Sequence, residues 1–192
     1  TVADLPGVGK NLHDHPAIGL RWAATTAEEL PAYPVHTHQL TLAYTSSPRY
    51  GRNDIRMRCQ GSYLASDSAG INRIVTGSIG VRATLESAQS LGELRLANSD
   101  PAVDPLLDYR LLDVAADRER LRDAARLAID LANSAPMARL VGARISPESD
   151  SFGSVAALDA WLLHTVGTAD HISGTCKMGP ASDRMAVVGQ DG

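Results

Sequence analysis

The residues best suited to chemistry lie in one short stretch, residues 171–179, with the sequence HISGTCKMG. It begins with His171, whose imidazole can accept or release a proton near neutral pH. Gly174 follows three positions later and carries no Cβ, so the backbone there can turn sharply and approach a ligand closely. We therefore predict that His171 is a proton-transfer residue in a reactive loop. The ordinary alternative is a loop histidine that bonds only to backbone.

Two histidine pairs suggest a different chemistry, namely His13 with His15 and His36 with His38. On a strand, alternate residues point to one face, and such a pair is one way to begin a metal site. However, residues 5–16 contain two glycines and two prolines, which predicts a turn. No carboxylate cluster with ligand spacing follows either pair. We predict no metal site, and a metal-dependent hydrolase stays the alternative from another enzyme class.

The composition indicates a soluble globular domain, because 44% of the 192 residues are hydrophobic and can bury a core. The 18 basic and 22 acidic residues form no long run of either sign, so we expect neither nucleic acid nor a membrane surface as a partner. No apolar run approaches the ~20 residues that a membrane span needs. Cys59 and Cys176 lack metal-ribbon spacing, which favours free thiols and a reducing, cytoplasmic location.

The elements that must position the loop begin with a series of strands. Alternation of polar and apolar residues predicts strands over residues 17–24, 36–45, 54–63, 73–84 and 93–97, the last closing a hairpin through Gly92. No helix long enough for a crossover separates them, so the sheet should be mostly antiparallel. A breaker-rich turn over residues 99–105 is expected to end the series.

Strand alternation also suggests three side chains for the wall of a substrate pocket, although ordinary core or surface positions are the alternative. They are Tyr44, Met57 and Tyr63.

Two helices follow the strands. Apolar residues recur every three or four positions over residues 113–134, with Asp113 as the predicted N-cap and with charges such as Arg122 and Arg126 expected in solvent. Ser154 is expected to cap a second helix, Val155 to about Val166, which delivers the chain to the His171 loop. We predict an α+β fold: a mostly antiparallel sheet of about five to six strands with both helices packed on one side.

Three motifs, taken in order along the chain, resemble those of the glucose-methanol-choline (GMC) family of flavin-dependent oxidoreductases. Residues 6–16 match its PGVGxNLxDHP run, and residues 90–105 resemble its SxGxxxLxSxDPxxxP passage, with Asn98 at the second serine and Ser99 after it. Residues 171–179 match HxxGTCxMG, whose histidine is the active-site base of the family. Family members often carry proline after this histidine, where Ile172 stands here.

The resemblance implies a reaction, a cofactor and a substrate class. The reaction would be oxidation of a small primary or secondary alcohol by FAD, with His171 as general base, and the electron acceptor stays open. The residues that the resemblance places at FAD or at the domain seam are Asn11, Asp14, His15, Gly174 and Thr175. For Asn11, Asp14 and His15 the alternative is that they form a turn and bond local backbone. A GMC-like hydroxynitrile lyase without net redox is the alternative within the family.

The resemblance also implies a division of the chain. Residues 1–16 would cross from a missing flavin-binding domain, residues 17–179 would form the substrate-binding domain, and residues 180–192 would start the return. Gly7 and Gly9 lack the third glycine of a nucleotide-binding fingerprint, because Leu12 stands at that position. We expect the fingerprint and a second catalytic His or Asn outside this chain. On its own, the chain would act only as a binding module. The outward face of its sheet would cover the flavin of the missing domain.

Overall fold

Polar and apolar residues alternate along the strands because one face of the sheet packs in the core and the other carries polar side chains. The computed structural model describes residues 4–25, 40–61, 63–66, 72–75 and 77–192. Within them the main sheet has six strands, all paired antiparallel, in the order β10-β1-β6-β3-β2, with β9 also paired to β1. The strands are β1 (Pro16–Ala24), β2 (Thr41–Tyr44), β3 (Ile55–Gln60), β6 (Ser78–Leu85), β9 (Val141–Ser146) and β10 (Gly167–Thr168).

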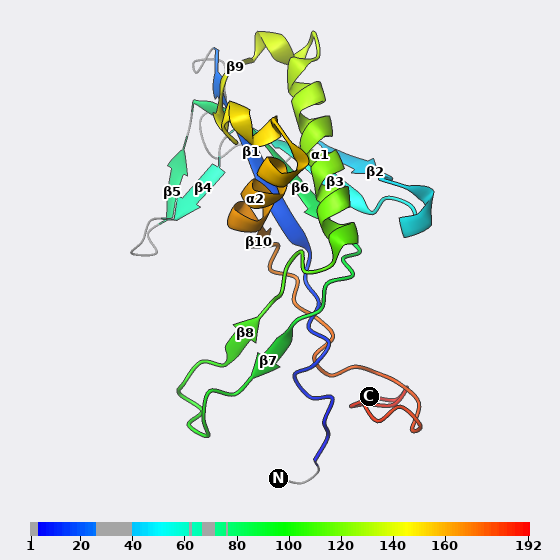
Figure 1. Ribbon diagram of the computed structural model, residues 1–192. Helices are drawn as coiled ribbons and strands as arrows, with labels where there is room; N and C mark the ends of the chain where they lie inside the picture. Colours follow the sequence, from blue (N-terminus) through cyan, green and yellow to red (C-terminus); the bar gives the residue numbers. More distant parts are fainter. Residues whose placement is uncertain (1–3, 26–39, 62, 67–71, 76) are drawn as a thin grey trace.

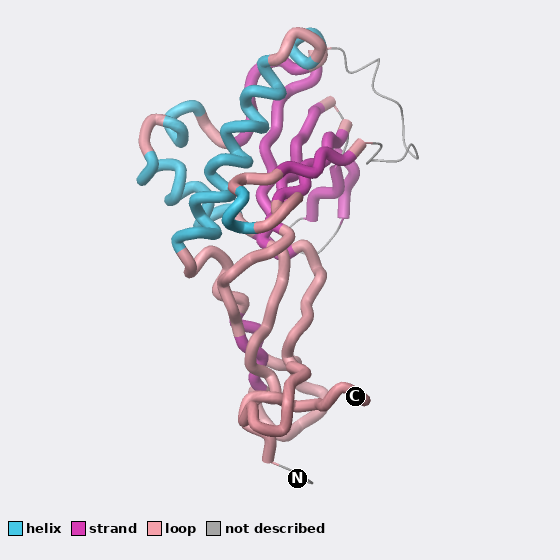
Figure 2. Tube along the Cα trace, turned by 90° about the vertical axis from the view of Figure 1, so that its right-hand side faces the viewer, coloured by secondary structure: helices cyan, strands magenta, loops and turns pink. Residues whose placement is uncertain are grey.

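Helices α1 (Ala115–Asn133) and α2 (Val155–Thr165) cover one face of this sheet (Figure 2). No described helix covers the other face, which we call the open face. Apolar side chains from alternate strand positions fill the space beneath them. Because the buried face of α1 is mostly alanine, the helix can lie close to the strands. The core includes Ile18, Leu20 and Trp22 of β1, Val81, Ala83 and Leu85 of β6, Ala124, Ala125 and Ala128 of α1, and Leu158 and Leu162 of α2.

The remaining elements are short. A hairpin of β4 (Tyr63–Ser66) and β5 (Asn72–Val75) lies beside the sheet, and single 3₁₀ turns occur at η2 (Pro48–Tyr50), η3 (Met137–Arg139) and η4 (Ser149–Phe152). The α+β class, the antiparallel sheet and both helices on one side are as predicted.

A narrow stem extends from this body and carries both ends of the chain (Figure 1). We define it as residues 4–15, the hairpin of β7 (Glu93–Arg95) with β8 (Leu106–Asp108), and residues 169–192. Backbone hydrogen bonds join its three parts: Gly9 N–H donates to the Thr175 carbonyl at 2.9 Å, and Leu94 N–H donates to the Gly9 carbonyl at 2.7 Å. The three family-like motifs therefore meet in the stem.

Two expectations about the strands are wrong. Residues 93–97 do not form a hairpin through Gly92, because β7 pairs with β8 and Gly92 bridges Leu12 instead. The turn over residues 99–105 does not end the strand series, since it links β7 to β8 and β9 follows later. Residues 73–84 divide into β5 and β6 at Gly77, where φ is +77°. Residues 36–39 of the second predicted strand lie outside the described residues.

Helix α1 differs from its prediction at its start and on its buried side. Its N-cap is Val114, whose N–H donates to the Ser90 hydroxyl at 3.0 Å, so Asp113 is not the cap. One turn later, Asp117 and Arg120 are almost completely buried and bonded to each other at 2.5 Å. The Arg120 guanidinium also lies 3.5 Å from the carboxylate of buried Asp54, the residue directly before β3. This ion network ties α1 to the start of β3.

Candidate active site

His171 lies where the body meets the stem, three residues after Thr168, the last residue of β10. Strand β10 pairs with the start of β1, so Thr168 is fixed opposite Pro16. The His171 side chain is exposed on this junction and is not buried beneath the sheet. Neither of its ring nitrogens has a hydrogen-bond partner among the described residues. An imidazole that is held by its backbone but left without a partner is suited to act on a molecule from outside.

Asp14 holds the backbone at His171 and at the neighbouring His15. Its Oδ1 accepts the N–H of His15 at 2.6 Å and the N–H of His171 at 3.1 Å, and its Oδ2 accepts the Thr168 hydroxyl. Asp14 is only 6% exposed, and a buried charge of this kind needs several donors. These donors come from both ends of the chain, so Asp14 fixes the start of the His171 loop.

His15 lies directly against His171. The ring centroids are 5.3 Å apart and the planes are nearly perpendicular, at 88°. His15 Nδ1 lies 3.2 Å from the Leu85 carbonyl, which can only accept, so Nδ1 carries a proton. When the ring is neutral, Nε2 is then the basic nitrogen. The sequence placed His15 at FAD or the seam, and the structure places it beside the predicted base.

A second set of contacts holds the loop three residues further on. Gly174 has φ of +88°, and an added Cβ would lie 2.4 Å from the Asn11 carbonyl oxygen. Asn11 Nδ2 donates to the Gly174 carbonyl at 3.2 Å, and its Oδ1 lies 3.2 Å from His13 Nε2. Ser173 and His13 exchange both backbone hydrogen bonds. Glycine is required here because the two chain segments touch through their backbones.

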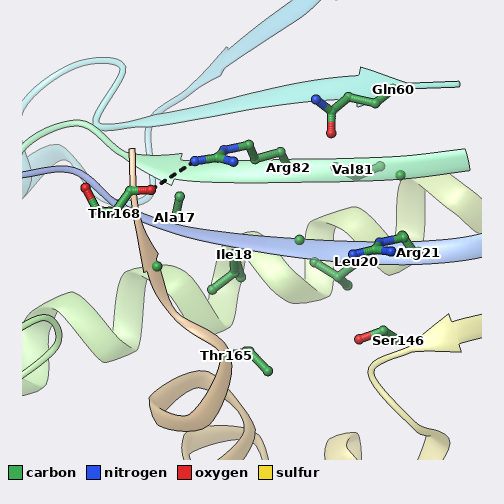
Figure 3. A pocket seen from close by; sticks show the side chains of 13 residues that line it. Ala17, Ile18, Leu20, Arg21, Gln60, Val81, Arg82, Ser146, Thr165 and Thr168 are labelled. Carbon is green, nitrogen blue, oxygen red and sulfur yellow. Dashed lines mark hydrogen bonds between the residues drawn. The ribbon is translucent and has the colours of Figure 1, made fainter. Parts of the chain in front are cut away.

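The open face of the sheet continues from His171 as a polar depression of about 220 Å³. Its lining joins the loop to side chains of β3 and β6: Arg58, Gln60, Arg82, Thr84, Glu86, Ala169, Asp170 and His171. A wider pocket of about 430 Å³ adjoins it over β1 and shares Gln60 and Arg82 (Figure 3). In that view Arg82 donates to the Thr168 carbonyl at 3.2 Å.

The predicted site residues lie close together, but their side chains differ in what they contact. Asn11, Asp14, His15, Gly174 and Thr175 all lie in the stem with His171, as one group. However, the polar groups of Asn11 and Asp14 are used within the chain, which makes these residues supports of the loop.

For Met57 and Tyr44 the core alternative holds, because neither lines the depression beside His171. Met57 is 2% exposed in the core beneath the helices, and Tyr44 packs against the same core. The side chain of Tyr63 lies outside the described part. Strand alternation was correct, but the site uses the other face, on which Arg58 and Gln60 alternate with Met57. The polar face of residues 54–63 was the signal that could have found them.

The histidine pairs do not form a metal site in the described residues. His13 bonds to Asn11 and His15 to Leu85, so the two rings have different partners. No group of three or more potential ligands comes together among residues that the structure describes. His36 and His38 lie outside them. Cys59 and Cys176 are both free thiols.

Comparison with known proteins decides the family. The family model described as GMC oxidoreductase matches residues 88–192, more than half of the chain. The chain belongs to the GMC oxidoreductase family. This match includes the second and third motifs, β7, β8, both helices and the His171 loop.

Two relatives are similar in sequence to this chain over its whole length. The chain is 29% identical to the glucose dehydrogenase [FAD, quinone] of Drosophila melanogaster, covering 100% of this chain and 35% of that protein. It is 28% identical to the oxygen-dependent choline dehydrogenase of Klebsiella pneumoniae (strain 342), covering 100% of this chain and 37% of that protein. The chain thus spans little more than a third of these relatives.

Solved structures show the same fold. Pyridoxine 4-oxidase from Mesorbium loti superposes with a TM-score of 0.82 at 22% identity, over 99% of this chain and 36% of that one. A formate oxidase from Aspergillus oryzae, in a structure that concerns FAD modification, superposes with a TM-score of 0.74 at 16% identity, over 92% and 39%. These identities support the fold alone. FAD in the names of the glucose dehydrogenase and the formate oxidase agrees with the cofactor predicted from the GMC resemblance. None of the described helices combines the length and the apolar character needed to cross a bilayer.

Proposed function

We propose that this chain is the substrate-binding part of an FAD-dependent alcohol oxidoreductase in which His171 is the general base. The observation that carries the proposal is the exposed, unpartnered imidazole of His171, held at its backbone by Asp14 beside an open polar depression. The holoenzyme is this chain within a longer flavoprotein of the size of its relatives. Residues 1–16 and 180–192 would connect to the flavin-binding part, and residues 17–179 would form the substrate side.

The residues present fit a flavin placed against the open sheet face. Helices cover the opposite face, so the open one is where a second domain can be received (Figure 2). Of the predicted cofactor residues, His15 and Thr175 keep a side-chain group that can touch FAD, because Asn11 and Asp14 are bonded inside the stem. Asn11, Asp14 and Gly174 would act by holding the loop.

The chemistry assigned to this chain is movement of one proton. The hydroxyl proton of an alcohol is too weakly acidic to leave unaided near neutral pH, so a neutral imidazole within about 3 Å lowers the barrier by accepting it. FAD, when bound, supplies the acceptor for the hydride from the carbinol carbon. After accepting the proton, the His171 imidazolium places a positive charge beside the developing alkoxide oxygen. His15, in contact with His171, helps to fix the ring plane.

The test is the rate of flavin bleaching when alcohol is mixed anaerobically with the holoenzyme. His171→Ala should lower this rate by roughly a hundredfold or more, with FAD content unchanged, since general-base catalysis contributes effects of that size. His164→Ala is the matched control, because His164 is exposed in the last turn of α2 and lines neither pocket. It should bleach at the parental rate.

Two results would contradict the proposal. An unchanged bleaching rate in His171→Ala would remove His171 from the mechanism. A flavin that no alcohol bleaches in the parental protein would contradict alcohol oxidation and would favour a lyase without net redox.

A further inference from the structure

Arginine side chains gather on the open sheet face beside His171. Arg58 and Arg82 line the same depression as His171, and Arg21 lines the adjoining pocket together with Arg82 (Figure 3). Arg58 and Arg82 are both half-buried.

Strand register places two of these arginines directly opposite each other. Arg58 of β3 pairs with Arg82 of β6, and Arg82 pairs in turn with Gly19 of β1. Residues opposite each other in an antiparallel pair have Cα atoms about 4.5–5.5 Å apart, and like charges in this position destabilise the sheet. Gly19 adds no side chain, which leaves space beside Arg82. The arrangement favours an anion bound between the two guanidinium groups.

Two acidic residues line the depression, and neither forms an ion pair with Arg58 or Arg82 among the described residues. Glu86 lines the depression but is bonded to Arg56 at 3.2 Å. Asp170 also lines it, but no ion pair joins its carboxylate to Arg58 or Arg82 among the described residues. Arg82 donates to the Thr168 carbonyl, which is neutral. Arg58 has no ion-pair partner within the described ranges. The positive charge of Arg58 and Arg82 is therefore available to a ligand.

We propose that the alcohols oxidised at this site carry a carboxylate, bound by Arg58 and Arg82 while the hydroxyl lies at His171. This inference rests on the proposed function and names its substrate class. A guanidinium fork matches a carboxylate with two parallel hydrogen bonds, which gives orientation as well as affinity. Gln60 and Thr84, in the same lining, supply neutral polar groups for the rest of the molecule.

The first experiment compares alcohols that differ only in charge. 4-(Hydroxymethyl)benzoate and 4-(hydroxymethyl)benzamide form one pair, and 6-hydroxyhexanoate and 6-hydroxyhexanamide form another. The holoenzyme should oxidise the carboxylate of each pair with a kcat/KM about ten- to a hundredfold above that for the amide. This is the range expected for charge-assisted hydrogen bonds. Equal values, or preference for the amides, would overturn the proposal and leave alcohol oxidation intact.

Variants assign the preference to residues. Arg58→Gln and Arg82→Gln should each reduce the carboxylate-to-amide ratio by roughly tenfold. Arg126→Gln should leave the ratio unchanged, because Arg126 lies on α1 and pairs with Asp123 at the exposed helix surface. If the arginine variants lose FAD or stability with the ratio unchanged, the arginines serve the flavin-binding part and the proposal is wrong.

A binding measurement separates this inference from the proposed function. Benzoate and benzamide cannot be oxidised as alcohols, so their binding to the holoenzyme, followed by calorimetry, does not depend on turnover. Benzoate should bind more tightly than benzamide, and Arg58→Gln should remove the difference. If no alcohol bleaches the flavin but benzoate is still preferred, the proposed function fails and the anion site stands. Equal binding of both ligands overturns the anion site.

Discussion

The backbone N–H of His171 donates to Asp14 Oδ1 at 3.1 Å, between residues 157 positions apart in sequence. The same carboxylate accepts the Thr168 hydroxyl and the His15 N–H. One buried charge therefore joins the first motif to the third. It also sets where the imidazoles of His15 and His171 meet.

Asp14 should consequently act as a positioning residue. Asp14→Ala removes the acceptor for all three donors, so we expect the rate of flavin bleaching to fall by about a hundredfold, the effect of a misplacement of ~1 Å. Asp14→Asn keeps one carbonyl oxygen for the two N–H donors and should recover most of the rate. Substrate affinity, measured from the dependence of the bleaching rate on alcohol concentration, should change little in both. A rate in Asp14→Ala equal to the parental one would contradict this role.

Gly174→Ala should damage the loop through the backbone alone. The positive φ costs about 1–3 kcal/mol for a residue with a Cβ. The new methyl would also meet the Asn11 carbonyl. We expect a lower thermal unfolding midpoint and slower flavin bleaching together. Gly189→Ala is the control, because no atom lies within 4 Å of its added Cβ. Equal behaviour of the two variants would show that the close approach of Gly174 to Asn11 is not needed.

Local patterns predicted the elements that depend on local physics. The apolar repeat over residues 113–134 predicted α1 to within two residues at each end, and Ser154 caps α2 through the Ala157 N–H as expected. Alternation in residues 54–63 also gave the two faces of β3 correctly. The grouping of the first motif with the His171 loop followed from the family resemblance.

Features that depend on distant partners could not be predicted in this way. The pairing of β7 with β8 and of Gly92 with Leu12 is a matter of tertiary register, which the turn residues do not specify. The burial of Arg120 depends on Asp54, far away in the chain, so its helix position alone indicated only a charged residue. Choosing Met57 for the pocket required knowing which face the helices cover.

The buried network on α1 predicts a large loss of stability from one substitution. Arg120→Met would leave Asp117 and Asp54 buried without their cation, at a cost of about 3–5 kcal/mol in the free energy of unfolding. Arg126→Met, on the same helix, removes only an exposed pair with Asp123 and should cost less than about 1 kcal/mol. Urea unfolding of both variants measures the difference. Similar losses would mean that the Arg120 network contributes no more than a surface pair.

The stem should lose stability in acid through Glu93. A hydrogen bond from Lys10 holds the pKa of the Glu93 carboxyl below its usual range, with further attraction from Lys10, Arg95 and Arg110. Because the folded state favours the ionised form, the stabilisation is complete above the pKa of a free glutamate. It is lost as pH falls through the lower pKa of the folded chain.

Lys10→Met should therefore shift the acid unfolding midpoint to higher pH, while Lys10→Arg keeps the cation and should restore most of the parental midpoint. The side-chain carbon resonance of Glu93, followed against pH, reports the cause directly. In Lys10→Met its pKa should rise toward that of a free glutamate, since the main hydrogen bond is gone. If Glu93 titrates alike in both proteins, the contact between residues 4–15 and β7 does not depend on this ion pair.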